Sequence, residues 1–150
     1  MVDVWIYSSR NAKRKRQKKM KAAEDKLQSA IVSYLKMEYR ALYCASLGGQ
    51  YQRYHSQRLK AKRIGYVAGF PDLFIYEARN GYNGLAIELK VKGKSPYKKD
   101  GTLKKIYAKG GKRHNQIIWR VKLNNRGYLA KVCTGFDDAK ETIDNYFKED

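Results

Sequence analysis

Two apolar stretches decide the fold of this chain: Gly69-Phe70-Pro71-Asp72-Leu73-Phe74-Ile75-Tyr76 and Leu85-Ala86-Ile87-Glu88-Leu89-Lys90. Each is an apolar run of β type with an acidic residue near one end. Between them lie Asn80-Gly81 and Asn83-Gly84, two turn dipeptides that favour a hairpin. The sequence therefore predicts two strands that pair side by side.

Three charged residues mark the ends of these predicted strands. Asp72 opens the first run, and Glu88 and Lys90 share one face of the second because side chains alternate along a strand. Pairing of the strands would gather the three into one cluster. Adjacent carboxylates repel, and a hard divalent cation with oxygen ligands relieves that repulsion. Such a cluster is typical of metal-assisted phosphodiester hydrolysis, in which carboxylates hold the metal and a lysine positions water or offsets developing charge.

Each feature alone has a plainer interpretation. A Pro-Asp pair before an apolar run is usually a turn that enters a strand, and a Glu-x-Lys pattern is usually a solvated strand face. Their combination, in this order and in so basic a chain, favours the functional interpretation.

The composition indicates one compact domain with a polyanionic partner. Of the 150 residues, 43% are apolar, which suits a single core. The formal net charge is +19, from 33 Lys and Arg against 14 Asp and Glu, so nucleic acid is the first expected partner and an anionic membrane surface the second. We find no apolar run of membrane-spanning length and no secretory signal, and we expect an intracellular protein. Cys44 and Cys133 lie in apolar runs and are predicted to be buried thiols in a reducing compartment, with neither a disulfide nor a zinc site.

The first 21 residues are predicted to form a basic arm, separate from a domain over residues 22–150. Met1 to Tyr7 are apolar-rich and suggest an added strand or a dimer contact. The dense block from Lys13 to Lys21 favours a solvated helix extension or a mobile arm. It either contacts phosphates or only keeps the chain soluble; the phosphate-binding candidates are Lys13, Arg14, Lys15 and Arg16.

Residues from Ala22 to about Leu42 have the apolar spacing of an amphipathic helix. Glu24 falls on the same face as Leu27 and Ile31. It is either a first-turn acid favoured by the helix dipole or a further metal-site carboxylate aimed at the sheet.

The remaining segments predict further strands, helices and basic loops. We expect a short strand over 42–47, a polar basic segment over 50–64, one arm of a basic hairpin over 103–108, a helix from about Arg113, a strand over 128–133 and a closing helix over 136–147. Cations interleaved with aromatic residues suit nucleic-acid binding. The candidates in these segments are Arg53, Tyr54, Arg58, Lys92, Lys94, Lys112 and Arg113.

The order of these motifs resembles the PD-(D/E)xK nuclease superfamily and, within it, the virus-type replication-repair nuclease (VRR-NUC) domain. The resemblance covers roughly residues 22–147. It rests on Glu24, Gly69-Phe70-Pro71-Asp72-Leu73, Ile87-Glu88-Leu89-Lys90, Gln116, Trp119 and Gly127-Tyr128. The segment between Lys90 and Gln116 is longer and more basic than is usual in that family.

The resemblance implies an α/β fold, with a central mixed sheet flanked by helices in a restriction-endonuclease-like core. It implies that Asp72, Glu88 and the backbone carbonyl of Leu89 bind Mg²⁺ or Mn²⁺, with Glu24 completing the site directly or through water. Lys90 would be the catalytic lysine, and Gln116 would orient Lys90 or a phosphate. Similar stand-alone proteins are structure-selective DNA nucleases of phages and other viruses, often homodimers, that act on branched or junction DNA. The competing hypothesis is a non-catalytic nucleic-acid-binding protein, which explains the charge equally well.

Overall fold

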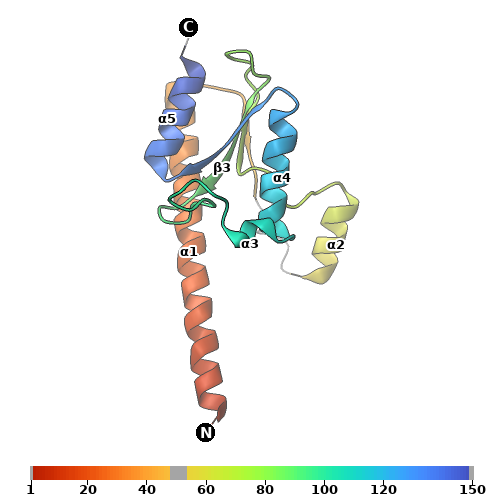
Figure 1. Ribbon diagram of the computed structural model, residues 1–150. Helices are drawn as coiled ribbons and strands as arrows, with labels where there is room; N and C mark the ends of the chain where they lie inside the picture. The colour runs from red at the N-terminus through yellow and green to blue at the C-terminus, as the bar shows by residue number, and fades with distance from the viewer. Residues whose placement is uncertain (1, 48–53, 149–150) are drawn as a thin grey trace.

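The structure is a computed structural model that describes residues 2–47 and 54–148, with the side chains of 11–47 and 54–148 (Figure 1). Its elements, in chain order, are α1 (Val2–Glu38), β1 (Tyr43–Ala45), α2 (His55–Arg63), β2 (Leu73–Ile75), β3 (Leu85–Lys90), α3 (Lys105–Ala108), α4 (Lys112–Asn124), β4 (Leu129–Thr134) and α5 (Phe136–Phe147).

The strands form one mixed sheet in the order β1-β2-β3-β4. The pairs β1/β2 and β2/β3 are antiparallel, and β3/β4 is parallel. Helices α1 and α5 pack on one face, and α4 packs over β3 and β4 on the other (Figure 1). The predicted α/β class, a mixed sheet flanked by helices, is confirmed.

The hydrophobic core lies on both faces of the sheet because strand side chains alternate. Ile87 and Leu89 belong to the cluster beneath α1 and α5, whereas Ala86 packs with Leu123 of α4. Alternation from Ala86 therefore places Glu88 and Lys90 on the α4 face. The first cluster consists of Ile31, Leu35, Leu73, Ile75, Leu85, Ile87, Leu89, Cys133, Ala139, Ile143 and Tyr146.

The predicted hairpin between the two decisive strands is present. Asn80 and Gly81 both have positive φ, at 50° and 75°. The backbones of Arg79 and Tyr82 exchange two hydrogen bonds across them, of 3.1 and 2.8 Å. Positive φ at both central positions is the pattern of a type I′ turn, which matches the twist of the flanking strands. Beyond this turn the two strands pair with Leu73 opposite Ile87, which is one residue away from the register that the Arg79–Tyr82 pair alone would give.

Two predictions about the helices are corrected by the structure. Helix α1 begins at Val2, so residues 2–7 form no strand. The basic block from Lys13 to Lys21 extends the helix predicted from Ala22, which was one of the two structures expected for it. The N-terminal half of α1 projects from the rest of the molecule (Figure 1). Within the described part of the segment 50–64, residues His55–Arg63 form α2. This helix buries none of its residues, so its sequence has no apolar face to reveal it.

Two smaller predictions were also wrong. Leu103 forms a single bridge with Tyr97, but Lys105–Ala108 is the short helix α3 and not an arm of a hairpin. Cys133 is buried, whereas Cys44 is exposed, and both thiols are free. Cys44 pairs with Phe74 on the sheet face that carries α4, but it lies on the edge strand β1, whereas α4 packs mainly over β3 and β4. Across the described residues, no helix has both the length and the apolar character needed to cross a membrane.

Candidate active site

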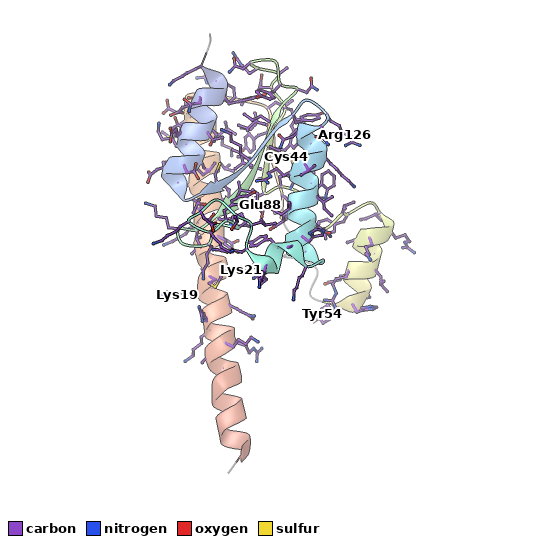
Figure 2. All side chains as sticks on the ribbon, in the orientation of Figure 1. Lys19, Lys21, Cys44, Tyr54, Glu88 and Arg126 are labelled. Atoms are coloured by element: carbon purple, nitrogen blue, oxygen red, sulfur yellow. The ribbon has the colours of Figure 1, made fainter. Side chains whose placement is uncertain are left out.

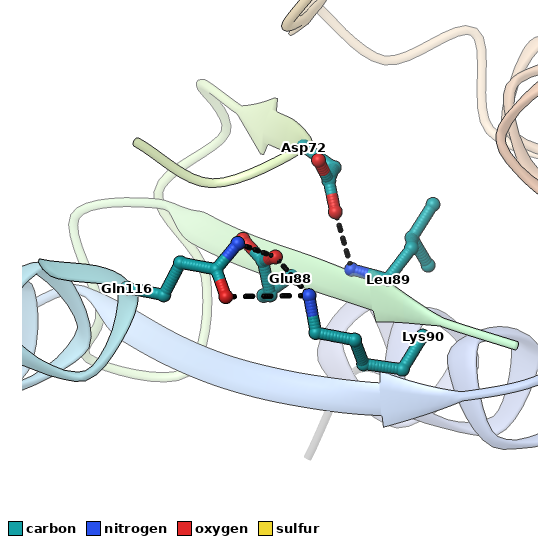
Figure 3. Close-up of polar contacts among 5 residues, drawn as sticks. All are labelled: Asp72, Glu88, Leu89, Lys90 and Gln116. Carbon is teal, nitrogen blue, oxygen red and sulfur yellow. Dashed lines mark hydrogen bonds and ion pairs between the residues drawn. The ribbon is translucent and has the colours of Figure 1, made fainter. Parts of the chain in front are cut away.

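Asp72 and Glu88 are neighbours on adjacent strands. Leu73 pairs with Ile87 in antiparallel strands. Asp72, which precedes Leu73, therefore lies beside Glu88, which follows Ile87. The Asp72 carboxylate is held there by the backbone of β3, since Leu89 N–H donates to its Oδ2 at 2.8 Å (Figure 3). The β2/β3 hairpin therefore brings together the two carboxylates that the sequence singles out.

Lys90 and Gln116 complete a polar triangle around Glu88 (Figure 3). Lys90 Nζ lies 2.5 Å from Glu88 Oε1 and donates to Gln116 Oε1 at 3.4 Å. Gln116 Nε2 donates to the same oxygen of Glu88. One carboxylate oxygen thus receives both donors, and Gln116 of α4 contacts the acid and the lysine together.

Burial and charge make this cluster electrostatically unusual. Glu88 is only 6% exposed. Burial, followed by the neighbouring charge of Asp72, raises the pKa of Glu88 to about 7. Burial also raises the pKa of Asp72. Burial lowers the pKa of Lys90, but the charge and hydrogen bond of Glu88 together with the charge of Asp72 outweigh burial, so the net shift is upward and Lys90 keeps its proton.

The second oxygen of Glu88 offers a direct test of whether a metal suits the site. Glu88 Oε2 is buried and finds no hydrogen-bond partner among the residues that the structure describes. A buried carboxylate oxygen without a donor is costly, and a cation is the natural ligand for it. The donor set of Asp72, Glu88 and the Leu89 carbonyl consists of oxygens, which Mg²⁺ prefers. The residues present therefore fit a hard divalent cation.

Glu24 stands further from this cation site than the other candidates. It is exposed on α1 and lines the same cavity as Asp72, Glu88 and Leu89. Over residues 11–47 and 54–148, no three His, Cys, Asp or Glu side chains are grouped closely enough to hold a metal ion. The arrangement suits two direct carboxylates with Glu24 reached through water, because Mg²⁺ usually keeps several of its waters.

The cluster opens into a cavity of about 700 Å³. Its walls come from the middle of α1, the segment after β1, the end of β3, the loop before α3, α3 itself and the first turns of α4. The cations in its lining outnumber the acids Glu24, Asp25, Asp72 and Glu88. These cations are Lys21, Lys90, Lys94, Lys104, Lys112 and Arg113.

Three residues that the predicted catalytic set did not include lie near the carboxylates or line the same cavity. The charge of Lys112 lowers the pKa of both Asp72 and Glu88, which places this first-turn lysine of α4 beside them. Burial, and then the charge of Asp72, raises the pKa of Tyr66. Tyr107 is buried and lines the cavity. Sequence reasoning proposed Lys112 only as a phosphate contact and missed both tyrosines, which no local pattern distinguishes among the 13 in the chain.

The other proposed nucleic-acid contacts are spread over the surface. Tyr54 and Arg58 are exposed at α2, which lies to one side of α4 (Figure 1). Lys92 is exposed and lies 3.4 Å from Asp137. Arg53 falls outside the described residues. Lys94, Lys112 and Arg113 line the cavity, and Lys13, Arg14, Lys15 and Arg16 are exposed on the projecting part of α1.

A solved structure described as a "VRR_NUC domain protein" is similar to this chain. The two superpose with a TM-score of 0.61 and 28% sequence identity, over 83% of this chain and 87% of that chain. A scan against protein-family models found no match, and a search of the curated proteins found none. The resemblance predicted from the sequence is confirmed by this neighbour, and the chain has a nuclease-type fold.

Proposed function

From this similarity to a VRR_NUC domain protein, we propose that the protein is a Mg²⁺-dependent endonuclease that hydrolyses DNA. Branched or junction DNA is its proposed substrate, in phage or viral replication and repair, and Mn²⁺ is expected to replace Mg²⁺. The observation that carries the proposal is the buried Oε2 of Glu88, which has no hydrogen-bond partner among the described residues. Lys90 and Gln116 both contact the other oxygen, Oε1, and Asp72 lies on the adjacent strand.

The acidic residues have the task of binding the metal. Asp72 and Glu88 would hold Mg²⁺ together with the Leu89 carbonyl, and Glu24 would contact its water shell. When bound, the ion would supply the Lewis acidity that polarises a phosphodiester. The hydrogen bond from Leu89 N–H fixes Asp72 for this task before any ligand arrives.

Lys90 and Gln116 act on the reacting groups. The Lys90 ammonium, held by Glu88 and Gln116, orients the attacking water and offsets the negative charge that grows on the phosphate. Attack of water on phosphorus breaks one ester bond and leaves a phosphate monoester and a hydroxyl group. No side chain is needed as a covalent nucleophile.

The cavity cations would hold the DNA backbone around the site. Each phosphate that they neutralise releases counterions, so binding is expected to weaken steeply with salt. A homodimer, as the resemblance suggests, would suit paired nicks on a two-fold symmetric junction. Light scattering and mapping of the two cut positions test that arrangement.

A cleavage assay on labelled single-stranded, duplex, flap and four-way-junction DNA tests the proposal. We expect products with Mg²⁺ or Mn²⁺, none with EDTA, and none from Asp72→Ala, which should still bind DNA. The net charge of +19 also favours a non-catalytic nucleic-acid-binding protein. Tight binding without products under any metal would favour that second function and reject the nuclease.

A further inference from the structure

Helix α1 forms one wall of the active-site cavity with a single face. Its cavity-lining residues recur at helical spacing and end with Gln28. With 3.6 residues per turn, they span roughly 160° of the helix surface. The lining residues of this face are Gln17, Met20, Lys21, Glu24, Asp25, Leu27 and Gln28.

The same face continues beyond the cavity along the projecting half of α1. Lys13 and Arg14 lie four and three residues before Gln17, respectively, and within about 60° of it around the helix. Lys19 and Lys26 lie on the opposite side, about 160–180° from Gln17. Figure 2 shows Lys21 on the side of α1 towards α3 and Lys19 on the other side. The projecting helix therefore has a cavity-side face and a back face, both carrying cations.

The charge of this projecting segment calls for an anionic partner. From Val4 to Ala23 the chain contains no acidic residue. The side chains of residues 11–19 are exposed. Like charges repel where they stand four residues apart on a helix, as in Arg14–Lys18 and Lys15–Lys19. A phosphate backbone along the helix would relieve that repulsion.

We infer that the cavity-side face of α1 is a guide for one DNA arm, with Lys13 and Arg14 contacting phosphates of the duplex that leaves the active site on that side. This inference rests on the proposed nuclease function, because it takes the cavity as the place of the cut phosphate. Glu24 and Lys13 are eleven residues apart, or about 16 Å along the helix axis. That length corresponds to about 5 base pairs of duplex.

The guide predicts a one-sided requirement for duplex length. The probe is a labelled flap DNA whose two duplex arms are each closed by a hairpin loop, so that short arms stay paired. The arms are shortened separately from about 12 to about 3 base pairs, and Kd is measured for the full chain in EDTA. We expect affinity to fall when one particular arm becomes shorter than about 5 base pairs. Shortening of the other arm should have little effect.

Matched double variants assign this length dependence to the cavity-side face. Lys13→Glu with Arg14→Glu should bind long-arm and short-arm DNA equally, and its slope of log Kd against log salt should fall by about 2. Lys19→Glu with Lys26→Glu removes as many cations from the back face and should keep the arm-length dependence. Because all four side chains are exposed, unchanged thermal unfolding would show that each variant is folded.

The outcomes separate the guide from the nuclease. Two results would overturn the guide. One is that both double variants lose the arm-length dependence of Kd equally, and the other is that this dependence persists in Lys13→Glu with Arg14→Glu. Parallel reactions with Mg²⁺ report on the proposed function. Binding that depends on arm length, without any cutting, rejects the nuclease but keeps the guide. Cutting without arm-length dependence supports the nuclease and rejects the guide.

Discussion

Gly69 lies so close to Asn115 that a Cβ on Gly69 would stand 2.7 Å from the backbone carbon of Asn115. It would also stand 2.8 Å from the backbone nitrogen of Gln116. Gly69 has φ +89°, a conformation that favours glycine. This contact joins the loop that carries Asp72 to the helix that carries Gln116. It sets how closely the two sides of the active site approach.

Gly69→Ala is therefore expected to push α4 away from the Asp72 loop. The strained φ and the backbone clash together predict a loss of roughly 1–3 kcal/mol in the free energy of unfolding. Cleavage should fall as well, because Gln116 moves from Glu88 and Lys90. Chemical denaturation and the cleavage assay measure the two effects.

Gly101→Ala is the matched control for Gly69→Ala. Gly101 has φ +80°, and within the described part of the chain nothing lies within 4 Å of its built Cβ. Gly101→Ala should therefore lower the free energy of unfolding through backbone strain alone and should still cut DNA. Equal cleavage by Gly69→Ala and Gly101→Ala would contradict a positioning role for Gly69.

Mg²⁺ should stabilise the wild-type fold in the absence of DNA. With a Kd of about 1 mM, 10 mM Mg²⁺ would add about 1.4 kcal/mol to the free energy of unfolding. For a chain of this size, that raises Tm by about 4 °C. Glu88→Gln should lose the shift because the amide cannot replace the buried carboxylate as a ligand. A differential scanning fluorimetry shift of equal size in Glu88→Gln would argue against this metal site.

Lys112→Ala should slow cleavage, because the charge of Lys112 lowers the pKa of Asp72 and Glu88. It should also weaken DNA binding, because Lys112 lines the cavity as a proposed phosphate contact. The loss of one phosphate contact should lower the slope of log Kd against log salt by about 1. Lys122, at the far end of the same helix, provides the control. Lys122→Ala should leave the salt slope and the cleavage rate at wild-type values. If both variants lost binding and cleavage equally, Lys112 would have no specific role at the site.

The hydrogen bonds around Asp144 should make the free energy of unfolding fall at low pH. Burial raises the pKa of Asp144, but hydrogen bonds from Lys140, Tyr34 and Tyr39 outweigh it and lower this pKa to about 2. Because the folded-state value is below the ordinary one, the stabilisation is complete above about pH 4 and is lost as pH falls towards 2. The side chain is 25% exposed, so we expect about 1–2 kcal/mol.

Asp144→Asn tests this contribution by urea unfolding at pH 7 and pH 2.5. The variant should be less stable than wild type at pH 7, and the gap should narrow at pH 2.5. Asp137→Asn is the control, because Asp137 is 82% exposed and its ion pair among the described residues is a 3.4 Å surface contact with Lys92. A gap that stays constant between the two pH values would contradict the assignment.

The sequence predicted those parts of the fold and site that local patterns encode. Strand alternation put Glu88 and Lys90 on one face, and Asn80-Gly81 predicted the hairpin that sets Asp72 beside them. Helix α2 escaped prediction because it buries no residue and so has no apolar period. The position of Tyr107 is a tertiary result, since α3 brings it to the cavity from a segment with no strong pattern.

The central claim is that Glu88 is required for metal-dependent cleavage of DNA, and Glu88→Gln tests it most directly. Glu88→Gln keeps the side-chain shape, while Glu141→Gln makes the same change at an exposed position of α5. In Mg²⁺, with the DNA structure that wild type cuts best, we predict that Glu88→Gln loses at least about 10²–10³-fold in rate but still binds DNA. Glu141→Gln should cut at the wild-type rate. Cutting by Glu88→Gln at the wild-type rate would contradict the account.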